Sequence, residues 1–359
     1  MFACLYKKFD KTFQPFKRST RSTFRSAKVT ETGKESIFSL PRNATLMPGD
    51  SILVSSTNDS LRISDSLLHQ MAAIPGRSTP AADGTAFFLE IAVFVSFIAL
   101  PFVIVRLRNK YRQKQAFKTA EETLQANFTQ YDESLSLNNA YYRSLPADLR
   151  RRFLERVVRF ASTKTFNCVN LPLEDRMPLL IGAAAVQISF GLDKYLLDFF
   201  DTIYIMQHNY NYGVFNQPFE GHVNSNGIYL SWDNFLKGFE DYTDADNVGI
   251  HEMAHALAYV NFMAGANSSQ DDEFIKRFYY FSAVARPIFN DMQNGKTNLL
   301  NAYAGTNYNE FWAVSVETFF EKSLHMKIDM PDLYAAMCNL LNQDPLLPEK
   351  LLHIPEMLF

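Results

Sequence analysis

The spacing of hydrophobic residues from Tyr141 onward predicts a mostly helical chain with a small β-sheet. Strands are expected at 199–206 and at 227–232, the second after a turn at residues 224–227. No repeat of fixed period is present. The pattern is therefore typical of an α+β fold. Helices are expected from Pro146 to about Phe160 and over 175–190, 246–263, 271–290 (ending near Pro287), 309–324 and 331–342.

Residues 86–105 differ from the rest of the chain because they are almost uniformly apolar. Their length is about the ~20 residues that cross the hydrocarbon core of a bilayer. Glu90 stands near one end, and a membrane helix tolerates Pro101. The segment therefore predicts a single transmembrane helix. Basic residues follow it closely and favour a cytoplasmic location for everything after it: Arg106, Arg108, Lys110, Arg112, Lys114 and Lys118.

The segments on either side of this span have a different character. Residues 1–85 are predicted to be a disordered basic and polar region, with a transit-like leader or a true start at Met47 as alternatives. Residues 106–140 are predicted to be a juxtamembrane helix and linker, with a loop at 132–139. The globular domain is then expected at 141–350.

Charge and cysteine content exclude several classes of protein. The net charge is −3, but the first 46 residues hold ten Lys and Arg against three Asp and Glu, which leaves −10 for the remainder. A body so acidic argues against nucleic-acid binding. The three cysteines are far apart and form no C-x-x-C pair. A disulfide framework and a cysteine zinc site are therefore not expected.

Residues 251–255 read H-E-x-x-H and carry the strongest chemical signal. On a helix, His251 and His255 are one turn apart on the same face, so both imidazoles can bind one zinc ion. Glu252 lies one step round the helix, where it can act on a water as a general base. Asp244 and Asp246 are N-cap candidates for this helix. Gly249 within it costs about 1 kcal/mol relative to alanine.

A catalytic zinc site needs a third protein ligand. The best candidates are Glu310 and Glu317, two turns apart on the predicted helix 309–324 among many apolar neighbours. Glu310 has an alternative role as a capping partner of Asn307. The residues alone do not choose between the two acids. The isolated histidines are weaker candidates: His208, His222, His325 and His353.

A family resemblance decides between the two acids. Residues from about 141 to 345 resemble the Mlc titration factor A family of zinc-dependent peptidases, whose catalytic core is similar to that of anthrax lethal factor. The matching stretches are Leu-Ser-Trp-Asp at 230–233, Asn-Val-Gly-Ile-His-Glu-Met-Ala-His at 247–255, Tyr-Ala-Gly-Thr at 303–306, Glu-Phe-Trp-Ala-Val at 310–314 and Glu-Thr-Phe-Phe-Glu at 317–321. The resemblance implies a zincin-like domain in which Glu310 is the third ligand, and it matches Tyr303 to the family's tyrosine. It leaves Glu317 as a partner of a ligand histidine.

We therefore predict a membrane-anchored zinc metallopeptidase with one Zn²⁺ per chain and a cytoplasmic catalytic domain at the inner membrane. Glu252 is predicted to act as general base, and Tyr303 to donate to the developing oxyanion. The strand at 227–232 is expected either to pair with an extended peptide substrate or to be an ordinary interior strand. The resemblance favours aminopeptidase action on short peptides. It also raises the alternative of a binding protein that sequesters a transcriptional regulator.

Overall fold

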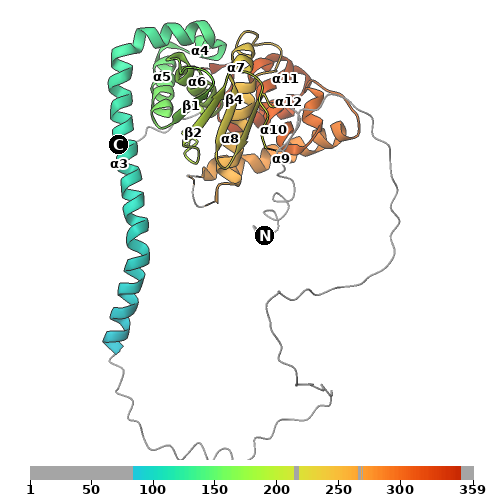
Figure 1. Ribbon diagram of the computed structural model, residues 1–359. Coiled ribbons are helices and arrows are strands. Elements are labelled where there is room, and N and C mark those ends of the chain that lie inside the picture. The colour runs from blue at the N-terminus through green and yellow to red at the C-terminus, as the bar shows by residue number, and fades with distance from the viewer. Residues whose placement is uncertain (1–83, 214–217, 266–267, 269, 349–359) are drawn as a thin grey trace, which may run out of the picture. The chain divides into compact units, whose positions relative to one another are not determined.

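The computed structural model describes residues 84–213, 218–265, 268 and 270–348 (Figure 1). The predicted disordered region lies outside these residues, except for the helical residues 84 and 85. The chain divides into two compact units. The described part of one unit is the helical segment 84–104, and the other contains all the remaining elements.

Helix α3 spans Gly84–Asn138 and includes the apolar segment at 86–105. Within the described part of the chain, no helix has the length and apolar character needed to cross a bilayer. The predicted transmembrane helix is therefore not confirmed, and α3 instead continues through the basic residues into the next unit for a total of 55 residues. The predicted inner-membrane location and cytoplasmic catalytic domain stay predictions.

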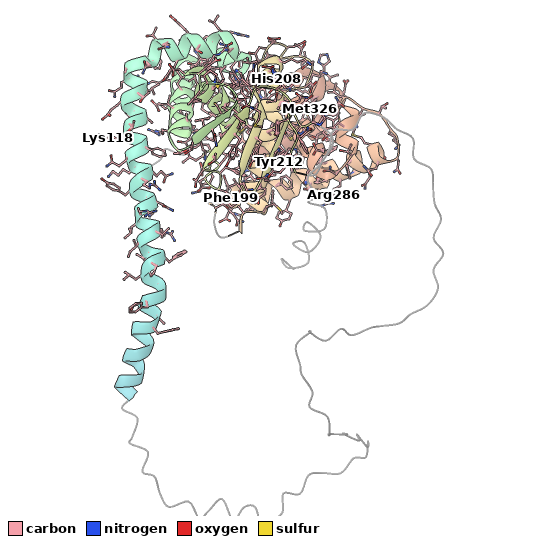
Figure 2. The ribbon with its side chains drawn as sticks, in the orientation of Figure 1. Lys118, Phe199, His208, Tyr212, Arg286 and Met326 are labelled. Carbon is pink, nitrogen blue, oxygen red and sulfur yellow. The ribbon has the colours of Figure 1, made fainter. Side chains whose placement is uncertain are left out.

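The end of α3 packs on the domain that follows. Leu124 and Leu135 are buried, and Glu121 lies 3.9 Å from Arg159 of helix α5 (Ala147–Ser162). By contrast, Lys118 is exposed, and its ammonium lies 3.9 Å from Glu122 on the same helix (Figure 2). The predicted loop at 132–139 is wrong, because burial of Leu135 keeps α3 helical to Asn138. Only residue 139 leaves the helix, where it caps the short helix α4 (Ala140–Ser144).

Four strands form one mixed sheet in the order β1-β2-β4-β3. Strands β1 (Thr165–Val169), β2 (Thr202–Met206) and β4 (Gly227–Ser231) are parallel, whereas β3 (Gly221–Asn224) pairs antiparallel with β4. The two strands predicted from the sequence are β2 and β4. Because β4 lies between β2 and β3, the expectation that it pairs with a substrate is wrong, and β3 is the edge strand on that side.

The two faces of the sheet differ in chemistry. On the covered face, Ile203, Ile205, Ile228 and Leu230 are fully buried in the core. The opposite face carries a row of partly buried rings, in which Tyr204 stacks on Tyr229 at 4.5 Å and Tyr229 on His222 at 4.2 Å. This alternation follows from the two-residue period of a strand. As a result, successive side chains of β3 face opposite ways, and His222 points away from the helices.

Helices cover this buried face of the sheet. Most of them come from the C-terminal part of the chain, which is coloured orange to red in Figure 1. Helix α8 contacts α6, α7, α10, β3 and β4, so it lies between the sheet and the later helices. The remaining helices are α6 (Arg176–Ser189), α7 (Trp232–Gly238), α8 (Val248–Phe262), α9 (Asp272–Gln293), η2 (Ala302–Gly305, a 3₁₀ turn), α10 (Tyr308–Glu321), α11 (Ser323–Asp329) and α12 (Pro331–Leu341).

These bounds agree with most of the predicted helices, with one clear correction. Helix α9 was expected to end near Pro287 but continues to Gln293. Proline removes one backbone hydrogen bond and leaves the carbonyl four residues earlier without its helical partner. That carbonyl belongs to Ala283, and both Ala283 and Pro287 are exposed, so water can take the missing partner's place.

Candidate metal centre

Helix α8 is fixed at its start by Asn247. The Asn247 side chain accepts a hydrogen bond from the Ile250 amide at 3.0 Å, and it donates to the Gly238 carbonyl at 2.7 Å. The predicted caps Asp244 and Asp246 are therefore wrong. Gly249 has a packing reason, because a Cβ atom there would lie 2.6 Å from the ring of Phe235 on α7. Glycine at position 249 weakens the helix, but it lets α7 pack closely on α8.

The three predicted ligands meet between α8 and α10. The Nε2 atoms of His251 and His255 are 3.1 Å apart, and Oε2 of Glu310 lies 3.0 Å from the first and 3.4 Å from the second. Asn307 caps α10 by accepting from the Glu310 amide at 3.1 Å. Because Asn307 does the capping, the carboxylate of Glu310 is directed at the two histidines instead.

These separations fit a metal ion. Ligands that lie about 2.0–2.1 Å from a tetrahedral zinc are about 3.3 Å from one another. The three donor atoms of His251, His255 and Glu310 match this edge length, and together they form a group able to hold a metal. Two imidazoles and one carboxylate are a common catalytic zinc set, with the fourth position open. In the described residues no other such group of His, Cys, Asp and Glu is present.

Glu317 holds the outer side of His251. Its Oε1 atom lies 2.6 Å from Nδ1 of His251, so Nε2 is the nitrogen that points to Glu310. Although burial opposes the charged imidazole, the carboxylates of Glu317 and Glu310 raise the pKa of His251 well above its usual range. The same carboxylates that favour a proton on this ring also favour a metal cation beside it.

Glu252 has the opposite environment. It is only 6% exposed, and its Oε2 atom is buried without a hydrogen-bond partner among the described residues. Burial raises the pKa of Glu252 to about 7, and His255 and His251 only partly offset this effect. A carboxylate with a pKa near neutrality can both accept and return a proton. A buried polar atom without a partner requires an explanation, and a role in proton transfer would provide one.

A pocket opens beside this centre. Its walls come from four places: residues 218–221 before and at the start of β3, the first turns of α8 and the residue before its cap, η2, and α10. The lining residues of the last three are Asp246, Val248, His251, Glu252, Tyr303 and Glu317. The ring of Tyr303 lies 6.1 Å from that of His251, centroid to centroid. Glu220 and Asp246 add two further carboxylates, and none of the described residues around the pocket is lysine or arginine.

The isolated histidines that the structure describes, His208, His222 and His325, take no part in the centre. His208 is exposed and lies 2.5 Å from Asp233, and His325 is exposed on α11. His222 lies on the open face of the sheet, where its Nδ1 is 2.8 Å from the hydroxyl of Tyr210. His353 lies outside the described residues. Of the predicted site residues, His251, Glu252, His255, Tyr303, Glu310 and Glu317 are brought together.

Sequence reasoning missed the strand that borders the pocket. Gly221 lies where a Cβ atom would be 2.5 Å from Cγ of Glu252, so this glycine and the general-base candidate are in direct contact. The predicted turn at 224–227 could have indicated this strand, because a tight turn before one strand commonly joins it to another. The run Gly-His-Val-Asn before it is the partner of β4 in a hairpin.

Similarity to known proteins covers this region. Residues 108–341 match the family described as Peptidase M90, glucose-regulated metallo-peptidase M90. The chain is also 23% identical over 224 residues to an uncharacterized protein, slr2042, of Synechocystis sp., and the aligned region covers 58% of this chain and 81% of the relative. The family match includes α8, η2 and α10, and hence every residue of the centre.

Proposed function

This chain belongs to the glucose-regulated metallopeptidases of family M90, and on that premise we propose that it is a zinc-dependent peptidase that hydrolyses peptide bonds with water. The observation that carries the proposal is the convergence of His251, His255 and Glu310. The carboxylate of Glu252 is next to His251 in the chain, and its Oε2 has no hydrogen-bond partner among the described residues. Zinc, when bound, lowers the pKa of water from 15.7 toward ~7 and polarises a carbonyl.

The protein's own groups would divide the remaining work. Glu252 takes a proton from the attacking water and passes it to the leaving amine, while the water oxygen bonds to the carbonyl carbon and the C–N bond breaks. Glu317 keeps His251 in one orientation through the hydrogen bond at Nδ1. Tyr303 lines the pocket and donates to the oxygen on which negative charge develops, a role typically worth ~10²–10³ in rate.

The edge strand β3 is the element best suited to bind an extended peptide. Its outer edge takes no further strand in the described sheet, although Tyr210 forms an isolated antiparallel bridge with Phe219 just before β3, and its first residues border the pocket. A peptide added to such an edge gains backbone hydrogen bonds and leaves its side chains to alternate between the two faces. The substrate class of the proposal is therefore a peptide in extended conformation.

Charge around the pocket supports aminopeptidase action, which the resemblance to the Mlc titration factor A family first suggested. The carboxylates of Glu220 and Asp246 favour a cationic group such as a free α-amine. Capture of a terminal carboxylate would call for a cationic partner, and the described pocket residues include no lysine or arginine. The alternative role, capture of a transcriptional regulator, stays a prediction that a pull-down with an inactive variant would test.

The proposal is tested on the full chain by zinc analysis and by cleavage of a peptide library with and without chelator. We expect about one zinc per chain and chelator-sensitive cleavage. Glu252→Gln should keep the zinc and lower kcat by ~10²–10⁴, because only the proton acceptor is lost. Glu240→Gln, at an exposed glutamate, is the matched control and should change neither quantity. Substoichiometric zinc, or full turnover by the Glu252→Gln protein, would overturn the proposal.

A further inference from the structure

Gly221 of β3 and Glu252 of α8 touch each other at the centre. A Cβ atom built at Gly221 would lie 2.5 Å from Cγ, 2.7 Å from Oε1 and 2.8 Å from Cδ of Glu252. Real Cβ atoms essentially never approach other atoms so closely. The volume that a side chain at position 221 would fill is therefore taken by the side chain of Glu252.

Backbone conformation does not explain this glycine. Four described glycines have a positive φ, namely Gly213, Gly227, Gly265 and Gly295, and Gly221 is not among them. Gly221 instead pairs regularly with Leu230 in the β3–β4 ladder. A glycine within a strand weakens it, and it often marks a place where another group approaches closely. Here the approaching group is a carboxylate that lines the pocket.

Hydrogen bonds leave the position of that carboxylate incompletely fixed. The Oε2 atom of Glu252 has no hydrogen-bond partner in the described residues, although it is buried. Contact with the walls of the pocket must then do much of the positioning, and β3 is the wall in contact with Oε1. Glu310 and Glu317 differ, because the carboxylate of each lies 2.6–3.4 Å from a nitrogen of a histidine ring.

We propose that Gly221 is a positioning residue, whose lack of a side chain sets the place of the Glu252 carboxylate against the edge strand. The proposal rests on the proposed function of Glu252 as general base. Any larger residue at 221 pushes the carboxylate away from β3. Because the displaced atoms belong to a side chain and not to the backbone, the chain still folds, but the base no longer stands beside a peptide bound along the strand.

The first test is kinetic and uses the zinc-loaded full chain. Gly221→Ala should retain about one zinc and lower kcat by ~10²-fold, the loss associated with a misplacement of about 1 Å, with KM changed much less. Gly305→Ala is the matched control, because a Cβ atom there meets its nearest neighbour at an ordinary 3.7 Å. In a Glu252→Gln background, Gly221→Ala should cause little further loss, since both changes act on one group.

The second test needs no activity and covers the case of poor folding. Gly221→Ala should lower Tm in the parent protein and much less in a Glu252→Ala background, where the colliding atoms have been removed. We expect a difference of about 2–4 °C between the two backgrounds. An equal fall in both backgrounds, or full kcat in Gly221→Ala, overturns the positioning role. Full kcat in Glu252→Gln alone would instead overturn the general base, and with it the proposed function.

Discussion

The carboxylates of the centre have two different environments. We call the part where α10 faces α8 the helix side, and the part where α8 faces β3 the strand side. On the helix side, Glu310 and Glu317 each lie within hydrogen-bond distance of a histidine ring, at 3.0 and 2.6 Å from His251. On the strand side, Glu252 faces a glycine and has a buried oxygen without a partner in the described residues. All three acids are at least nine-tenths buried.

Their pKa values show what the difference means. Burial opposes the ionisation of Glu310, but His255 and His251 lower its pKa well below the usual range, so it is always a carboxylate. Burial raises the pKa of Glu252 to about 7, and the same histidines compensate only in part. A group that holds a cation has to stay charged, whereas a group that moves a proton has to titrate near the working pH. The two sides meet these two requirements separately.

The largest effect is expected from Glu310→Gln on the helix side. The amide keeps the shape of the side chain but removes the charged oxygen that completes the donor set. We expect zinc affinity to fall by more than about 100-fold, beyond the ~10–100-fold typical for partners outside the ligand set. Competition with a chromophoric chelator measures this. Glu273→Gln, at an exposed surface pair with Lys276, is the control.

Glu317→Gln should have a smaller effect of the same kind. The amide oxygen can still accept from Nδ1 of His251, so ring orientation is retained and only the charge is lost. We expect zinc affinity to fall by about 10–100-fold. The order of these two variants is the sharpest check on the helix side. If Glu317→Gln removed the metal and Glu310→Gln did not, the assignment of the third ligand would be reversed.

A third acid on α10 could break the comparison, because the helix side also holds one incompletely satisfied carboxylate. Glu321 accepts from Asn247 at 2.9 Å, but its Oε2 atom is buried without a hydrogen-bond partner among the described residues. Burial raises its pKa to about 8; the hydrogen bond from Asn247 opposes this, whereas Glu317 and Asp244 reinforce it. The group lies beside Asn247, the cap of α8, and is not one of the three ligands.

The sign of its effect on stability follows from the direction of this shift. The pKa of Glu321 is about 8 in the folded state and about 4.5 in the unfolded state. The free energy of unfolding is therefore highest below pH 4.5, and it falls by up to ~1.4 kcal/mol per pH unit as the pH rises toward 8. Glu321→Gln should remove the decline and stabilise the fold at pH 8 by up to ~5 kcal/mol, with little change at pH 4.5. Urea midpoints at the two pH values measure it, with exposed Glu240→Gln as control. Equal pH dependence in variant and parent would contradict the shift.

The helix side was also the side that the sequence predicted well. Helix α8 was expected at 246–263 and spans Val248–Phe262, because its apolar positions and its H-E-x-x-H spacing have the same helical period. The residues themselves left Glu310 and Glu317 undecided, because two acids two turns apart on one helix face look alike in sequence. What separates them is which nitrogen of His251 each one meets, and that depends on the packing of α10 on α8.

The strand side could not be predicted in the same way. Strands β1 and β3 contain no buried position, unlike β2 and β4, so their alternation of apolar and polar residues is weak. Strand β1 depends on pairing with β2, which is distant in the sequence, and β3 depends on pairing with β4 in a hairpin. Gly221 carries no chemical group, so no residue type signals its contact with Glu252. Only the tertiary structure shows that the side chain of Glu252 fills the volume beside this glycine.

The smallest effect is expected on the far face of the same edge strand, at His222. This ring stacks on Tyr229 at 4.2 Å, and its nitrogens lie 2.8 Å from the Tyr210 hydroxyl and 3.1 Å from the Asn224 amide. His222→Phe keeps the stack and loses both hydrogen bonds, so stability at pH 7 should fall by ~1 kcal/mol. Zinc affinity should stay within about two-fold, because successive side chains of a strand point to opposite faces and Gly221 faces the centre.

Acidification distinguishes this local role from a role in the centre. Burial lowers the pKa of His222 to about 4, below its unfolded value of about 6.5. A depressed folded pKa gives stability that is present above pH 6.5 and is lost as pH falls toward 4. The parent should therefore lose its advantage over His222→Phe in that interval, whereas exposed His325→Phe should show no such crossing. Loss of zinc from His222→Phe at pH 7 would mean that both faces of β3 act on the metal, and the separation of the two sides would not hold.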